Sequence, residues 1–348
     1  MNLRWFIITS CITVFILMIF LVYENERFGS KIPEDDEQKG LKEQIVIRLS
    51  HVVSENTPKG LAAQKFAELV QKKTNGKVKV EVYANGFLYP DGEELDALER
   101  GEIQMAAPSF TKMTNIVPEW KVLDLPFLFR DDKHVKFVFT GEIGREMLNM
   151  LDEKSMKALA FWSNGFKQMT SRKKPLLKVS DFKGQTFRVM SGEVLERQFQ
   201  MLGAEAVATP FNEVYSTLEN QKVDGQENTI SNIYSKSLYK HQKNLTLSNH
   251  GYLGYAVIIN EDFWNELSPS IQDKIKEALD ETTVWILNES SQMNKKQLKE
   301  LKNKSDLKIY DLPPEAKERW IEKFKPLYEE VEQEVGSDMI EKIKEAGD

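Results

Sequence analysis

The sequence is poor in the residues that build reactive or metal-binding centres. It has one cysteine, Cys11, and four histidines without metal-like spacing. A disulfide, a thiolate nucleophile and a cysteine metal site are therefore excluded from everything that follows Cys11. Dinucleotide, phosphate-loop, zinc-protease and nucleophile-elbow motifs are also missing from the sequence. We therefore predict no catalytic residue, no metal site and no cofactor, and an enzyme is disfavoured.

The chain also lacks an excess of positive charge. Its 47 Lys and Arg residues are outnumbered by 54 Asp and Glu residues, the net charge is -7, and the basic residues are scattered. This balance argues against a nucleic-acid binder, which needs a basic face to neutralise phosphates. A hydrophobic fraction of 41% over 348 residues is enough to bury a core, and this length favours two domains.

Long hydrophobic runs are absent except for one near the N-terminus. After Arg4, the 19 residues from Trp5 to Tyr23 carry no charge, close to the roughly 20 that a membrane-spanning helix needs. We predict that residues 1–23 anchor the chain, with the N-terminus cytoplasmic and the remainder exported. Residues 24–44 are polar and aperiodic and are predicted to be a tether between the membrane and the folded part.

Two alternatives remain open for this N-terminal segment. Ile8-Thr9-Ser10-Cys11 resembles a lipoprotein box, which would make Cys11 a lipidated residue. A cleaved secretory signal is the other alternative, although no small-residue cleavage site follows the run. All three interpretations place the folded part outside the cytoplasm.

From Ile45 onward, period-2 and helical patterns alternate. Strands are expected at 45–49, 77–83 and 103–109, with helices between them. A second such series begins near residue 157. This rhythm predicts two α/β halves with largely parallel sheets, each half with its own sheet, and a ligand cleft between them. The segment from Pro269 to about Lys304 is predicted to be one long helix packed across the body, with an apolar stripe that includes Val284.

Two basic residues lie within segments that otherwise read as strands. Arg188 alternates with Phe187 and Val189, so it faces either solvent or the cleft. In the cleft its planar guanidinium would bind a carboxylate through two hydrogen bonds. Lys167 has the same two interpretations, an exposed lysine or a second cation near the cleft. Two cations at opposite ends of a small pocket would suit a ligand with two carboxylates.

The segment Phe211–Asn228 ends on three polar residues, Gln226, Glu227 and Asn228, where a strand is expected. Strands favour β-branched and aromatic residues, so a polar triplet indicates a rim that faces water or a ligand. The pattern alone does not decide between the two.

Five segments together resemble a known family. They are "LSHVVSENTPKG", "LPFLFRDDKH", "NGFKQMTS", "DFKGQTFRV" and "TPFNEVYSTLENQKVDGQEN". They are similar to segments of the extracytoplasmic solute receptors of tripartite ATP-independent periplasmic (TRAP) transporters, and more narrowly of the C4-dicarboxylate-binding branch. The similarity runs in order from about residue 45 to the C-terminus.

The resemblance implies a set of ligand-binding residues. Arg188 would bind the ligand carboxylate, and Asn228 would help to hold the same group. Phe211 would pack against the carbon skeleton, and His51 and Ser109 would close from the other lobe. Lys167 stands where many relatives carry arginine, and the small Ser109 stands where sialic-acid binders carry glutamate. These two departures argue against a large sugar acid.

The resemblance also implies the architecture and the function. It implies a two-lobed periplasmic-binding-protein fold, with lobe I at 45–164 plus 253–292 and lobe II at 165–252 plus 293–348. The lobes would close on succinate, fumarate or malate for delivery to a membrane permease. The alternative is a membrane-anchored co-sensor that reports dicarboxylate occupancy to a sensor kinase.

Overall fold

The computed structural model describes residues 44–151 and 155–347. The predicted anchor, most of the predicted tether and Cys11 lie outside the described residues. Among the helices that are described, none is both long and apolar enough to cross a membrane.

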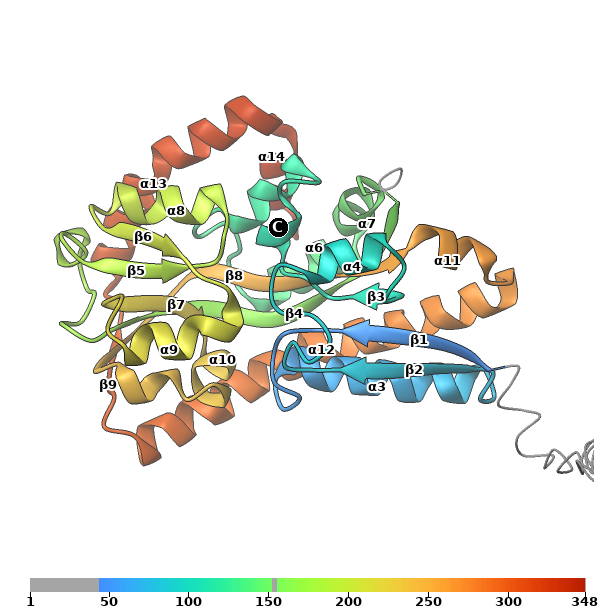
Figure 1. Cartoon of the computed structure of the whole chain (residues 1–348). Coiled ribbons are helices and arrows are strands. Elements are labelled where there is room, and N and C mark those ends of the chain that lie inside the picture. Colours follow the sequence, from blue (N-terminus) through green and yellow to red (C-terminus); the bar gives the residue numbers. More distant parts are fainter. Residues whose placement is uncertain (1–43, 152–154, 348) are drawn as a thin grey trace, which may run out of the picture. The chain divides into compact units, whose positions relative to one another are not determined.

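Nine strands occur within the described residues, and they form a single mixed sheet (Figure 1). Their order is β2-β1-β3-β8-β4-β7-β5-β6, and β9 pairs with β8. The strands are β1 Ile45–Ser50, β2 Val78–Tyr83, β3 Met105–Ala106, β4 Met156–Ser171, β5 Thr186–Val189, β6 Glu205–Ala208, β7 Gly225–Thr229, β8 Asn244–Asn260 and β9 Lys308–Asp311.

Helices connect and cover these strands. The α-helices are α3 Pro58–Lys73, α4 Glu94–Glu99, α5 Phe110–Met113, α6 Asp132–Thr140, α7 Glu142–Asn149, α8 Glu193–Met201, α9 Val214–Glu219, α10 Ile230–Ser235, α11 Glu261–Glu266, α12 Pro269–Lys304, α13 Pro314–Val335 and α14 Asp338–Glu345. Short 3-10 helices occur at η1 Pro118–Asp124, η2 Val179–Asp181, η3 Phe211–Glu213 and η4 Leu238–His241.

The prediction that each half has its own sheet is wrong. The antiparallel strands β4 and β8 pair from Met156 with Asn260 to Ser171 with Asn244. One end of β8 also pairs with β3, and one end of β4 also pairs with β7, so the two sets of strands share a continuous hydrogen-bond ladder. The sheet is mixed rather than largely parallel for the same reason. The predicted lobe boundaries at 164/165 and 252/253 fall inside these two strands and stay a prediction.

The helix expected from Pro269 to about Lys304 is present as α12, with proline in its first turn. It contacts α3, α6, α10 and β4. Ile271, Ile275 and Ile286 are buried as expected, but Val284 is 46% exposed and does not belong to the packed face. The spacing of the apolar residues therefore predicted the helix correctly but wrongly placed Val284 on its buried face.

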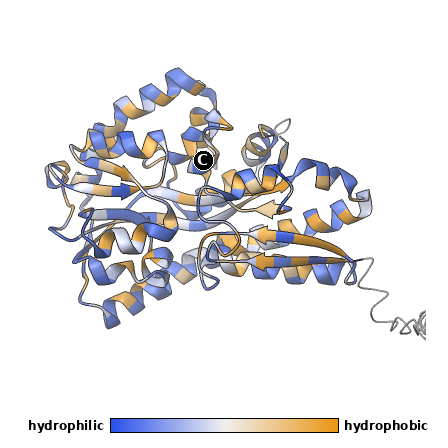
Figure 2. Ribbon diagram, in the orientation of Figure 1, coloured by the Kyte–Doolittle hydropathy of each residue, from blue (hydrophilic) through white to orange (hydrophobic). Residues whose placement is uncertain are grey.

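The strand β7 is unusual for its polarity. Figure 2 shows it as a hydrophilic strand inside the sheet, between β4 and β5. Gln226, Glu227 and Asn228 are 0%, 3% and 4% exposed, so the interpretation of this triplet as a water-facing rim is wrong. Because buried polar groups need partners, the burial of β7 requires a dedicated set of hydrogen bonds around it.

Candidate functional site

A small pocket lies next to Asn228, and we call it the Asn228 pocket. Its volume is about 30 Å³, room for a water molecule or two. Residues from widely separated parts of the chain line it, among them Val53, Lys59, Asp91, Glu94, Ser109, Lys112, Met190, Phe211, Asn228, Asn232 and Tyr255.

Buried polar side chains gather around this pocket, and among them Ser109 Oγ has no hydrogen-bond partner among the described residues. The others are the ring of His51, beside the Val53 backbone, and the side chains of Asn232 and Tyr255, beside each other. Each unpaired buried group costs roughly 1–3 kcal/mol. The concentration of buried polar side chains beside one pocket indicates a place where a polar molecule binds.

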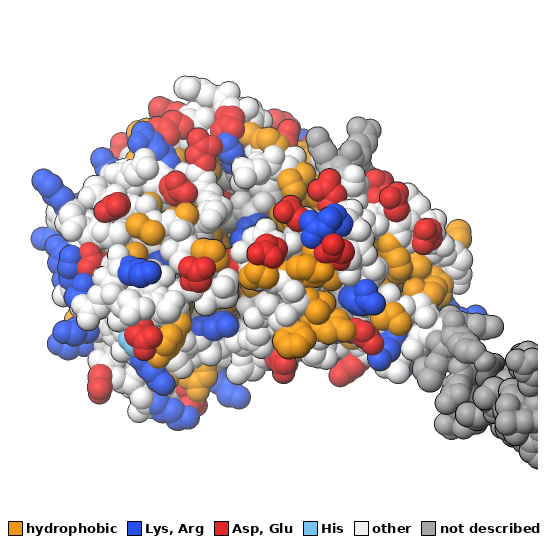
Figure 3. Space-filling view, viewed as in Figure 1, with side chains coloured by type: hydrophobic (Ala, Val, Ile, Leu, Met, Phe, Trp, Pro, Cys, Tyr) orange, Lys and Arg blue, Asp and Glu red, His pale blue; other side chains and the backbone are white. Residues whose placement is uncertain are grey.

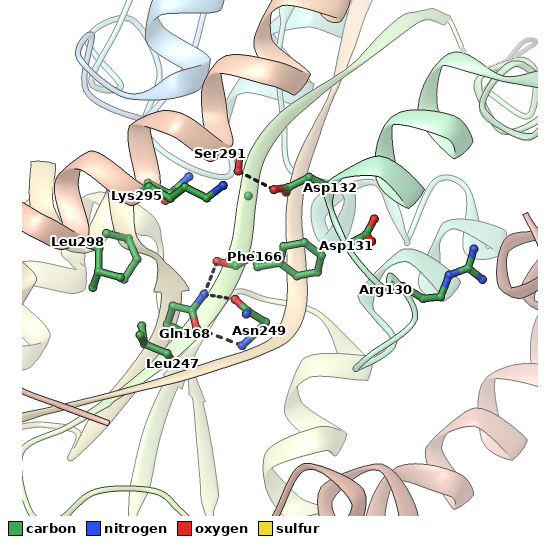
Figure 4. Close-up of a pocket in the computed structure, with 13 residues that line it drawn as sticks. Arg130, Asp131, Asp132, Phe166, Gln168, Leu247, Asn249, Ser291, Lys295 and Leu298 are labelled. Carbon is green, nitrogen blue, oxygen red and sulfur yellow. Dashed lines mark hydrogen bonds between the residues drawn. The ribbon is translucent and has the colours of Figure 1, made fainter. Parts of the chain in front are cut away.

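A larger pocket, about 310 Å³, lies beside α12 (Figure 4). It contains none of the six residues predicted to bind ligand. Two pairs of its polar side chains bond to each other: Gln168 Nε2 donates to Asn249 Oδ1 at 2.6 Å, and Ser291 Oγ donates to Asp132 Oδ2 at 2.6 Å. We therefore place the candidate site at the Asn228 pocket despite its smaller volume.

The strand β7 positions Asn228 at the start of α10. Asn228 Oδ1 accepts from Asn232 Nδ2 at 2.8 Å and from Thr229 N at 3.1 Å. Thr229 is the N-cap of α10, and its hydroxyl accepts from Asn232 N. The end of the strand and the first turn of the helix thus hold the Asn228 amide in one orientation.

Glu227 lies at the centre of a buried ion pair. Its Oε1 accepts from Lys167 Nζ at 2.6 Å, and its Oε2 lies 2.7 Å from His250 Nε2. Burial alone would raise the pKa of Glu227, but Lys167 and His250 together lower it to about 2. Gly251 makes room for Lys167, because a Cβ at that position would lie 2.6 Å from Lys167 Cε.

Arg188 on β5 is 1% exposed, which excludes the interpretation of a solvent-facing arginine. Its Nε and Nη2 both donate to the Thr209 carbonyl, at 3.0 and 2.5 Å. Among the described residues, no carboxylate lies within ion-pair distance of its guanidinium. Burial lowers the pKa of Arg188 to about 10, opposed by the more distant charges of Asp91 and Glu227.

Four charged residues line the opposite side of the pocket. Lys112 Nζ pairs with Asp91 Oδ1 at 2.6 Å, and Asp91 Oδ2 accepts from Phe211 N at 2.7 Å. Glu94 accepts from Ser50 Oγ at 2.9 Å, and burial raises its pKa despite the charge of Lys59. The pocket thus holds two carboxylates that are already engaged by protein groups.

Lys59 is the fourth of these residues. Its Nζ donates to the Ala107 carbonyl at 2.8 Å and lies 3.8 Å from the centre of the Tyr255 ring. Burial lowers the pKa of Lys59, and Glu94 and Asp91 oppose that shift. Nearby, burial and the charge of Lys59 lower the pKa of His51 to about 3, so His51 is neutral at pH 7.

The residues that the structure describes contain no cluster of His, Cys, Asp or Glu suited to a metal ion. The Asn228 pocket combines the cations Lys59 and Lys112, the carboxylates of Asp91 and Glu94, and polar side chains such as Ser109 and Asn228.

Comparison with known proteins assigns this chain to a family. Residues 49–334 match the family of bacterial extracellular solute-binding proteins, family 7 (DctP). The chain belongs to this family. It is 46% identical, over 94% of this chain and 93% of the relative, to the C4-dicarboxylate-binding protein DctB of Bacillus subtilis.

Solved structures agree with this assignment. A TRAP periplasmic solute-binding protein from Sulfurospirillum deleyianum with bound succinate is 42% identical, with a TM-score of 0.83 over 87% of this chain and 99% of that one. A homologue from Shewanella oneidensis, also with bound succinate, is 38% identical, with a TM-score of 0.84 over 88% of this chain and 100% of that one. The resemblance to TRAP receptors is confirmed, and this family 7 protein has their mixed α/β two-lobed fold.

The pocket of this family 7 protein brings together some of the residues predicted from the sequence. Ser109, Phe211 and Asn228 line it. His51 directly precedes the lining residues Val52 and Val53.

The other two predicted residues do not line the Asn228 pocket. Arg188 lies two residues before the lining residue Met190, and Asp91, which also lines the pocket, acts on its pKa. Lys167 is instead paired with Glu227 on β7. The pattern of a basic residue in a strand left each side chain either exposed or facing the cleft, whereas the structure buries both and determines their partners.

Sequence reasoning missed Lys59, Asn232 and Tyr255. A signal for Lys59 was present, because it is the second residue of α3, where the helix dipole disfavours a positive charge. A lysine in the first turn of a helix therefore indicates a negative charge nearby that offsets the helix dipole. Tyr255 lies in the apolar strand β8 and gave no comparable signal.

Proposed function

We propose that this protein is an extracytoplasmic receptor that binds a C4-dicarboxylate, namely succinate, fumarate or malate, and delivers it to a TRAP permease. The observation that carries the proposal is Arg188, a buried cation without a carboxylate partner among the described residues. A buried cation is costly unless an anion compensates it. The names of the relatives, which bind C4-dicarboxylates or succinate, support the ligand class.

The proposed binding mode uses Arg188 and Asn228 for one carboxylate and Phe211 for the carbon skeleton. His51 and Ser109 approach from the strands β1 and β3, at the other end of the sheet. The pocket is smaller than a four-carbon acid, so binding requires the two halves to separate and then to close. Hinge closure of this kind is common in periplasmic binding proteins, and contacts from both halves favour the closed state.

The proposed function includes attachment of the receptor to the cell membrane. The stretch Trp5–Tyr23 would hold the receptor at the outer face of the cell membrane, and α12 would span both lobes. Fractionation of the full-length chain and of a chain without residues 1–23 tests the anchor: both chains in the soluble fraction would contradict it. A receptor that reports to a sensor kinase would use the same pocket, so co-purification with the permease, rather than ligand titration, distinguishes the two outputs.

Thermal-shift titration of the wild-type protein and of Arg188→Ala tests the ligand. A dicarboxylate at 100 times its dissociation constant stabilises the fold by about 2.7 kcal/mol, or a few degrees. We expect that shift with succinate, fumarate or malate, a much smaller one with sialic acid or glucuronate, and none with Arg188→Ala.

Arg197→Ala is the matched control, because Arg197 pairs with Glu330 on the surface at 44% side-chain exposure. It should keep the wild-type response. Full affinity in Arg188→Ala would remove Arg188 from the site. A wild-type response to sugar acids alone would keep a receptor and overturn the dicarboxylate assignment.

A further inference from the structure

Two lysines, Lys59 and Lys112, line the Asn228 pocket, and we compare them with the buried Lys167, which pairs with the residue before Asn228. Lys167 pairs with Glu227 at 2.6 Å, and Lys112 pairs with Asp91 at 2.6 Å. Lys59 alone has no carboxylate within 4 Å among the described residues, and its Nζ contacts a carbonyl oxygen and the face of Tyr255. A lysine that is 1% exposed with only these contacts can accept an anion without breaking an ion pair.

Two hydroxyl groups lie in the same part of the pocket. Ser109 and Tyr255 face each other across a backbone bridge between neighbouring chain segments. Ser109 Oγ is buried and has no hydrogen-bond partner among the described residues. The buried Tyr255 hydroxyl lies beside the Asn232 side chain, which also lines the pocket. Both hydroxyl groups can donate, so with Lys59 they supply three donors to one acceptor group, the set that a carboxylate with two oxygens uses.

We propose that Lys59, together with the hydroxyl groups of Ser109 and Tyr255, binds the second carboxylate of the ligand and selects dicarboxylates over monocarboxylates. This inference rests on the proposed function, in which Arg188 binds the first carboxylate. It replaces the sequence-based expectation that Lys167 is the second cation, because the charge of Lys167 is already used by Glu227.

The placement of the two cations fits a ligand that joins the two halves. Arg188 lies on β5, next to the last strand at one end of the sheet. Lys59 lies on α3, which packs against β2 at the other end (Figure 1). Asp91, which lines the pocket with Lys59, acts on the pKa of both groups. A dicarboxylate held at one end by Arg188 and at the other by Lys59 would favour the closed state, and a monocarboxylate would leave Lys59 without a counterion.

Calorimetric titration of the full-length protein with succinate and with butyrate tests the proposal. The two ligands have four carbons each and differ in one carboxylate. Lys59→Met should weaken succinate binding roughly 10- to 100-fold and leave butyrate binding nearly unchanged. Tyr255→Phe, which removes only a hydroxyl, should weaken succinate binding several-fold and also spare butyrate.

Lys72→Met is the matched control, because it removes the same charge from an exposed position on the same helix. It should bind as the wild type does. A wild-type ratio of succinate to butyrate affinity in Lys59→Met would overturn the role of Lys59 while the receptor function stands. If Lys59→Met does not fold, an unchanged ratio in Tyr255→Phe overturns the proposal. A wild-type protein that binds no dicarboxylate would instead overturn the proposed function, and this inference with it.

Discussion

The buried pair of Lys167 and Glu227 allows a quantitative prediction for the substitution Glu227→Gln. Both side chains are 2% exposed, and Glu227 also contacts His250, whose Nδ1 bonds to Ser248 Oγ at 2.7 Å. Glutamine keeps the shape of glutamate and removes its charge. Lys167 then stays buried without a counterion.

Breaking a buried ion pair by removing one partner costs roughly 3–5 kcal/mol. That is a large part of the 5–15 kcal/mol typical of a folded domain, so Glu227→Gln should fold but unfold at clearly lower urea concentration. The double substitution Lys167→Met with Glu227→Gln removes both charges and keeps the volume. It should recover most of the loss, because neutral replacements of buried pairs are often tolerated.

The assay is urea unfolding at pH 7.5, followed by the fluorescence of the six tryptophans. The pair lowers the pKa of Glu227 below its usual value of 4.5, so its contribution is present above that pH and is lost as the pH falls toward 2. The difference between Glu227→Gln and the wild type should therefore shrink at pH 3.

Two results would refute this reasoning. One is a Glu227→Gln protein within 1 kcal/mol of the wild type, on the order of a single net hydrogen bond. The other is a double variant as unstable as the single one, which would mean that shape and not charge causes the loss. The double variant also bears on the ligand: retained succinate affinity agrees with Lys59 as the second cation, and lost affinity with an intact fold would return that role to Lys167.

Two further substitutions test other parts of the fold. Burial raises the pKa of Asp124 from 3.8 to about 6, and the charge of Lys167 opposes this shift. The protonated form of Asp124 therefore stabilises the fold at low pH, and this stability is lost as the pH rises through 6. In Asp124→Asn the free energy of unfolding should therefore fall by roughly 3 kcal/mol less between pH 4 and 7.5 than in the wild type. Urea unfolding that shows the same pH dependence in both proteins would contradict this prediction. Gly165 has φ +118°, and an added Cβ would lie 2.8 Å from Asn294 Nδ2. Gly165→Ala should therefore lower the free energy of unfolding by roughly 1–3 kcal/mol. The control is Gly184→Ala, where φ is +70° and no atom lies within 4 Å of the added Cβ. Equal losses at both positions would show that the contact with Asn294 does not matter.

The distribution of charge on the surface agrees with what composition predicted. On the face shown in Figure 3, basic and acidic side chains both occur over the body, and basic ones are more frequent along its left edge. The charges that matter for the candidate site are instead buried, and composition carries no information about them.

Local pattern was sufficient for the elements whose stability is local. The helix α3, with its Thr57 N-cap, lies between the strands expected at 45–49 and 77–83, and the helix α12 begins at Pro269 as predicted. The alternating valines near residue 80 formed the strand β2. These signals act over one or two turns of the chain, so a single sequence contains them.

The sequence by itself determined the absence of cysteine chemistry beyond Cys11, the α/β class and the family. Only the tertiary structure decided which side chains meet. Lys167 and Glu227 are 60 residues apart and pair because β4 and β7 align Lys167 with Thr229. Lys59 meets the Tyr255 ring because α3 and β8 pack around one pocket. Strand register and packing set such contacts, and no local pattern records them. The sequence therefore singled out basic residues within strands, and the fold determined which buried cation remains available to an anion.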